Sequence, residues 1–113
     1  MAAVPNQKRV RIRENSWLAR LAAFFLGSKS AVAMVWGRSI HVWGATREQF
    51  LQNPGWLRHE LAHIEQVSRY GWVPFVLLYA WYSIRFGYYN NPFEVAARQK
   101  EKEPVEIGSY VFV

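Results

Sequence analysis

The 113-residue sequence contains no cysteine and no aspartate. The absence of cysteine excludes a disulfide framework, a thiolate metal site and a thiol nucleophile. Because aspartate is absent, all eight acidic side chains are glutamates, and there are only three histidines. A metal site in this chain must therefore be built from glutamate and histidine.

The sequence also lacks a hydrophobic run long enough to span a bilayer. The closest segment is WVPFVLLYAWYSI, residues 72–84, whereas a membrane-spanning helix needs about 18 to 20 residues. We therefore expect a cytoplasmic protein, with peripheral membrane contact as a further expectation. The formal charge is +6, and QKRVRIRE, residues 7–14, supplies much of it. Such a cluster can bind anionic lipid or nucleic acid, but a solvated basic strand is the simpler interpretation, and we expect no nucleic-acid partner.

The remaining composition is that of one small folded domain, residues 1–113. Half of the residues are hydrophobic (51%), with 6 Trp, 6 Tyr and 7 Phe, which excludes a disordered chain. Hydrophobic periodicity and capping residues predict an α+β fold with about four helices and a short sheet. The expected elements are a basic strand at 9–13, a helix at 17–26, a hairpin of runs 30–36 and 38–44, a short helix after Thr46, and helices at 54–70, 73–86 and 93–101.

The segment WLRHELAHIEQ, residues 56–66, contains the pattern His-Glu-x-x-His. Side chains four residues apart share one face of a helix, so His59 and His63 can direct ring nitrogens to one metal ion. Glu60 lies one position round from His59, where it can take a proton from a water that the metal activates. The pattern is informative but can also arise on a polar helix face.

A catalytic zinc site needs a third protein ligand. The all-histidine continuation of the motif is excluded, because Gln66 and Arg69 stand where glycine and histidine are required. Glu101 and the other glutamates of charged segments are expected to be solvated. Two candidates remain, His41 on the hairpin and Glu94 at the start of the last helix, where Glu94 could instead complete an Asn91 cap.

The order HELAH, long hydrophobic helix, NPFEVAAR resembles the gluzincin metallopeptidases, and in particular the small soluble minigluzincins. The resemblance covers residues 39 to about 100 and implies that His59, His63 and Glu94 bind Zn²⁺ while Glu60 acts as general base and acid. It further implies a peptide or protein substrate that pairs with an edge strand, here SIHVWG, before the active helix.

The chain departs from that family at one position, and its sequence does not identify the residue that would stabilise the oxyanion. Many gluzincins have an aspartate four residues after the third ligand, where this chain has Arg98, so a glutamate or a backbone carbonyl must orient the zinc histidine. A donor to the oxyanion is also required. The sequence does not choose among its candidates, which are His41, Tyr79, Tyr82, Tyr88 and Tyr89.

Two alternative functions follow from other segments. The extended tail, residues 103–113, could fill the cleft of a catalytically silent zinc-binding module. The basic strand together with the aromatic helix 72–86 could instead make a membrane-surface binding protein.

Overall fold

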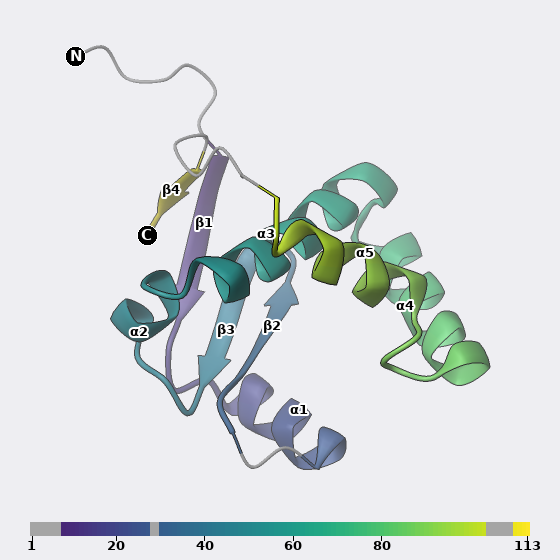
Figure 1. Ribbon diagram of the computed structural model, residues 1–113, viewed down its shortest axis with the longest axis horizontal. Helices are drawn as coiled ribbons and strands as arrows, with labels where there is room; N and C mark the ends of the chain where they lie inside the picture. Colours follow the sequence, from purple (N-terminus) through teal and green to yellow (C-terminus); the bar gives the residue numbers. More distant parts are fainter. Residues whose placement is uncertain (1–7, 28–29, 104–109) are drawn as a thin grey trace. The chain divides into compact units, whose positions relative to one another are not determined.

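The computed structural model describes residues 8–27, 30–103 and 110–113. Within these ranges it contains five helices and four strands, which confirms the α+β class (Figure 1). The sequence predicted about four helices, and the shortest of the five found is the expected short helix after Thr46, which spans five residues. In chain order the elements are β1 (Lys8–Arg13), α1 (Trp17–Leu26), β2 (Val32–Trp36), β3 (Ser39–Trp43), α2 (Arg47–Leu51), α3 (Pro54–Tyr70), α4 (Trp72–Phe86), α5 (Pro92–Lys100) and β4 (Tyr110–Phe112).

The chain divides into two compact units, which we call the sheet unit and the helical unit. The sheet unit comprises the described residues up to Gln52 and those of the C-terminal strand, and the helical unit begins at Asn53 and contains α3, α4 and α5. The single-domain organisation stays a prediction.

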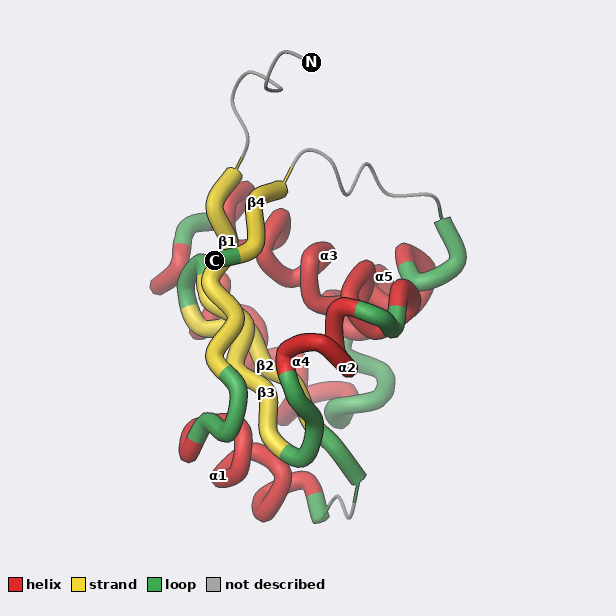
Figure 2. The backbone as a smooth tube through the Cα atoms, turned by 90° about the vertical axis from the view of Figure 1, so that its left-hand side faces the viewer, coloured by secondary structure: helices red, strands yellow, loops and turns green. Residues whose placement is uncertain are grey.

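The sheet unit holds four strands in the order β2-β3-β1-β4. Strands β2 and β3 form the predicted antiparallel hairpin around Gly37, whereas β1 pairs in parallel with β3 and with β4, as the arrows in Figure 1 show. Figure 2 shows the same strands in yellow from another side. The predicted edge position of the strand SIHVWG is wrong, because β3 has a partner on both sides. The parallel partner comes from residues 11–13, a pairing that no local sequence signal indicates. The edge on this side is β2.

The two faces of the sheet differ in composition. Val10, Ile12, Ile40 and Val42 are buried on one face, as the alternation of side chains along each strand requires. On the other face lies His41, which is also buried and hydrogen-bonds through Nδ1 to the hydroxyl of Ser16 at 2.7 Å. Because Ser16 is the N-cap of α1, this bond places the start of α1 on the His41 face.

The helical unit is bounded by the predicted capping residues. Asn53 accepts a hydrogen bond from the backbone of Trp56, and Pro54 follows at the first helical position. Gly71 separates α3 from α4 with a φ of 86°, in the region that favours glycine. Both α4 and α5 contact α3, so the three helices pack as one group. No helix in the described part of the chain is long and apolar enough to cross a membrane; α4 has 15 residues.

Candidate metal centre

The His-Glu-x-x-His segment lies in the middle of α3, on its inner side. Glu60 and His63 are buried, at 3% and 6% exposure, and the side chain of His59 is 14% exposed. Leu57, Leu61 and Ile64 recur at three- and four-residue spacing on a different face of the helix, 100° or more round from the two histidines, and are buried as well. The motif is therefore part of the packed interior and not a solvated polar face.

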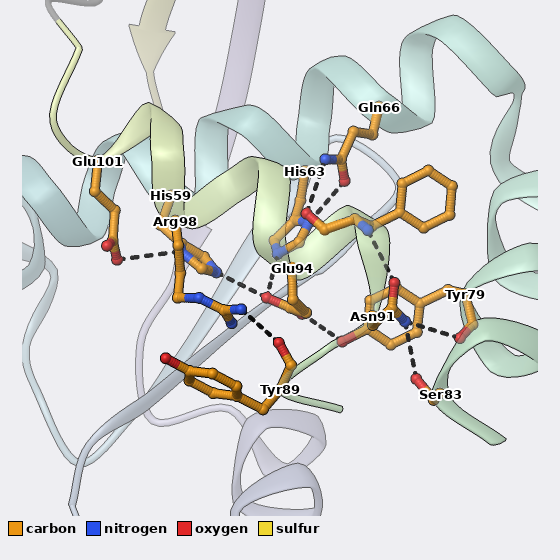
Figure 3. Close-up of polar contacts among 11 residues, drawn as sticks. His59, His63, Gln66, Tyr79, Ser83, Tyr89, Asn91, Glu94, Arg98 and Glu101 are labelled. Carbon is orange, nitrogen blue, oxygen red and sulfur yellow. Dashed lines mark hydrogen bonds and ion pairs between the residues drawn. The ribbon is translucent and has the colours of Figure 1, made fainter. Parts of the chain in front are cut away.

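Glu94 enters from the first turn of α5 and its position is fixed by Asn91. The Asn91 side chain is fully buried. Its Oδ1 accepts from the backbone of Phe93 at 2.9 Å, while its Nδ2 donates to the carbonyl of Tyr79 at 3.1 Å and to the hydroxyl of Ser83 at 3.0 Å. Asn91 thus caps α5 and holds its start against α4, which sets where Glu94 points (Figure 3).

The carboxylate of Glu94 is the point at which the three helices of the unit meet. Its Oε1 lies 2.9 Å from Nε2 of His59 and 3.1 Å from Nε2 of His63. Its Oε2 accepts a short hydrogen bond from the hydroxyl of Tyr79 on α4. Both oxygens of Glu94 are therefore engaged with side chains of α3 and α4, and the carboxylate is not turned back to the Asn91 cap.

The outer ring nitrogens of both histidines also have partners. Nδ1 of His59 lies 3.1 Å from Oε1 of Glu101, and Nδ1 of His63 lies 2.9 Å from Oε1 of Gln66. Gln66 in turn donates to the carbonyl of Phe93 at 3.0 Å. These contacts fix the rotation of each ring and leave both Nε2 atoms directed at Glu94. Glu101, which the sequence led us to expect in solvent, keeps 37% of its side chain exposed and in addition orients His59.

Glu101 is itself held in place, and Arg98 is turned elsewhere. Arg58 donates to the carbonyl of Glu101 at 3.0 Å. Arg98, where the resembling family has an aspartate, lies with its guanidinium 3.9 Å from the ring centroid of Tyr89 and donates to the Tyr89 carbonyl. A glutamate therefore occupies the orienting position, as the sequence required, but it comes from three residues further along the chain. Glu94 and Glu101 are seven residues apart, which is close to two helical turns, so both point to one side.

Burial and mutual contact shift the pKa values of the acidic and basic groups in the site. Burial raises the pKa of Glu60 to about 7, although the neighbouring histidines oppose the shift. Burial alone would lower the pKa of His63, but its hydrogen bond to Glu94 and the charge of Glu60 outweigh burial and raise it to about 9. For Glu94, hydrogen bonds from His59 and His63 outweigh burial and hold its pKa below the usual range.

This arrangement can hold a metal ion. The ligand-type atoms of His59, Glu60 and His63 all lie within 4.8 Å of one another. Glu94 approaches the two histidines more closely than this, since its Oε1 is within hydrogen-bond distance of both Nε2 atoms. Glu94 is therefore a candidate third ligand beside the two histidines. A buried carboxylate between two imidazoles is the arrangement expected where a cation can replace shared protons.

The other sequence candidates have different surroundings. His41 belongs to the sheet unit, where burial and the charge of Arg13 lower its pKa and its Nδ1 is hydrogen-bonded to the hydroxyl of Ser16. Tyr79 is engaged by Glu94, and Tyr82 packs against Phe93 with ring centroids 5.5 Å apart. Burial raises the pKa of Tyr88 to about 12, and the negative charges of Glu94 and Glu60 add to the shift, so its hydroxyl remains a donor.

Comparison with known proteins gave no further identification. The chain has no match among protein-family models, curated proteins or solved structures.

Proposed function

We propose that the protein is a zinc-dependent metallopeptidase, with His59, His63 and Glu94 as the zinc ligands and Glu60 as the general base and acid. The observation that carries the proposal is the convergence of two Nε2 atoms on one oxygen of Glu94, at 2.9 and 3.1 Å. Two imidazoles and one carboxylate form the donor set of a catalytic zinc site that keeps one position open.

The residues that contact the two histidines favour zinc over harder cations such as magnesium and calcium. Each histidine is fixed through Nδ1, by Glu101 or by Gln66, in the way that zinc-binding imidazoles are commonly oriented. Magnesium and calcium favour all-oxygen sites, which this group of side chains does not supply. When bound, zinc would supply a Lewis acid that lowers the pKa of water and polarises a carbonyl group.

The chain's own contribution to the reaction is a proton shuttle. Glu60 is buried beside the two histidines, and its pKa of about 7 lets it accept a proton from the attacking water and return it to the leaving amine at neutral pH. Tyr79 stabilises the charged form of Glu94 through its hydrogen bond to Oε2. The attacked bond would be a peptide bond, as the resemblance of HELAH and NPFEVAAR to gluzincins implies.

The test is a pair of substitutions assayed on zinc-loaded protein against a mixture of unstructured peptides. Glu60→Gln keeps the size of the side chain but removes the base, so we expect turnover to fall by about 10²-fold or more with zinc still bound. Glu65→Gln is the matched control, because Glu65 is exposed on the same helix. Unchanged turnover in Glu60→Gln would reject the assigned mechanism.

The same assay separates the peptidase from a catalytically silent zinc-binding module. A wild-type protein that binds zinc but cleaves no peptide would favour the silent module. For the variant of that module in which the tail fills the cleft, Tyr110–Phe112 pairs with β1 in the sheet unit. Residues 104–109 of the tail lie outside the described residues.

A further inference from the structure

Helix α1 packs on the sheet with its small residues and exposes its large ones. Ala19 and Ala23 are buried, whereas Trp17 and Phe24 are 72% and 77% exposed. A surface helix normally has the opposite orientation, with its large apolar side chains against the core. At 100° per residue the exposed apolar side chains fall within an arc of about 100°. They are Trp17, Leu21, Phe24 and Phe25.

A row of arginines lies on the same side of the sheet as α1. In β1, Val10 and Ile12 are buried on one face, so the exposed residues that alternate with them, Arg9, Arg11 and Arg13, share the other face. The pairing of β1 with β3 shows that this is the face of the sheet on which α1 begins. Arg13 stands opposite His41, the residue that contacts the start of α1. Arg13 is the last residue of β1, and α1 begins at Trp17, so the row ends where the chain leads into α1 (Figure 1).

Most of the excess positive charge of the chain lies in the sheet unit. Among the described residues the sheet unit has seven lysines and arginines against two glutamates, whereas the helical unit has six against five. Five of the six excess charges therefore lie in the unit that carries the exposed aromatic helix. α1 itself contains one charged residue, Arg20, which is exposed.

We propose that α1 and β1 form a docking surface for an anionic membrane, which we call the α1–β1 face. Trp17, Phe24 and Phe25 enter the boundary between headgroups and acyl chains, with α1 lying in the plane of the interface. The arginine row of β1 contacts anionic lipid headgroups. The combination of an apolar helix face with adjacent cations is the pattern by which peripheral proteins bind such surfaces, and neither part alone gives stable attachment.

Two other occupants fit the α1–β1 face less well. A second copy of the chain also carries a net charge of +6, so two copies repel where an anionic bilayer attracts. A nucleic acid would pair with the arginines but would leave the aliphatic and aromatic side chains of α1 in water. The inference goes beyond the proposed peptidase activity, and zinc content plays no part in it.

The test is flotation of the full chain with phosphatidylcholine vesicles, with and without phosphatidylserine. We expect binding to the anionic vesicles only, and a partition coefficient lower by about tenfold or more in the double variant Phe24→Ser, Phe25→Ser. The matched control is Leu77→Ser, Ile84→Ser, which removes two exposed apolar side chains from α4 in the nearly neutral helical unit. Loss of binding in the α4 variant with none in the α1 variant would overturn the proposal.

A second pair of variants tests how much the arginines of β1 contribute to vesicle binding. Arg9→Gln, Arg11→Gln should weaken binding on the order of tenfold and reduce its dependence on salt, whereas Lys100→Gln, Lys102→Gln should leave it nearly unchanged. Absence of binding to anionic vesicles would refute the proposal. So would a concentration-dependent dimer that the α1 variant converts to monomer, or an oligonucleotide that binds the protein more tightly than the vesicles do.

Discussion

Oε1 of Glu94 lies 2.9 Å from Nε2 of His59, although the two residues are 35 positions apart in the chain. The contact brings a carboxylate of α5 to the histidines of α3 and depends on two supports outside the pair. Asn91 fixes the start of α5, and Glu101 fixes the ring of His59.

Removal of the Tyr79 hydroxyl should weaken zinc binding. Tyr79→Phe keeps the packing of the ring against Phe75 and Phe93 but deletes the hydrogen bond to Oε2 of Glu94. We expect a loss of about tenfold in zinc affinity, measured by competition with a chromophoric chelator. Tyr82→Phe is the control, and equal affinities for the two variants would show that the hydroxyl does not support the ligand.

Glu101 should matter for zinc binding in spite of its place in a charged segment. Glu101→Ala frees the ring of His59 to rotate, and we expect zinc affinity to fall by about 10- to 100-fold. Glu103→Ala removes an exposed carboxylate two residues further on, which pairs only with Lys100 among the contacts described. If both variants bound zinc equally well, the orienting function of Glu101 would be wrong.

Zinc affinity should rise with pH through the neutral range. The pKa of His63 in the metal-free site is raised to about 9, so below this value a proton occupies the nitrogen that zinc needs. Each unit of pH between about 6 and about 8 should therefore increase the apparent affinity roughly tenfold, with the gain levelling off above about 9. An affinity that stays flat across this range would mean that His63 is already neutral or is not a ligand.

Asn53 caps α3 and Asn91 caps α5, and each is followed by a proline. Their replacement should nevertheless lower the free energy of unfolding by different amounts. Asn53→Ala removes one exposed cap, at a cost of about 1 kcal/mol in the free energy of unfolding. Asn91→Ala removes a buried cap and two donor contacts to α4, so we expect about 2 to 3 kcal/mol. Urea denaturation of the metal-free variants measures the free energy of unfolding of each. Equal losses in the two variants would contradict the conclusion that Asn91 holds the start of α5 against α4.

Local sequence signals predicted most of the elements and part of the site. Asn53-Pro54 and Asn91-Pro92 stand where α3 and α5 begin, and Thr46 and Gln49 form a capping box at the start of α2. Such signals act within a few residues, so they are visible in one sequence. The same locality explains why Glu94 and His41 could not be separated from the residues alone, since the choice depends on how three helices pack.

The errors come from contacts between distant segments. The parallel pairing of β1 with β3 joins residues 28 positions apart and converts a predicted edge strand into an interior one. Glu101 was dismissed because it follows a lysine in a charged run, yet its spacing of seven from Glu94 places both on one helix face. Gln66 could likewise have been found, because it lies one turn after His63.

The most direct test is the zinc content of the purified protein, measured by elemental mass spectrometry for the wild type and for Glu94→Ala, with Glu65→Ala as the exposed control. We predict one zinc ion per chain in the wild type and in the control, and little or none in Glu94→Ala after the same dialysis. A wild-type protein without zinc even after reconstitution, or a Glu94→Ala variant that retains it fully, would contradict the three-ligand site.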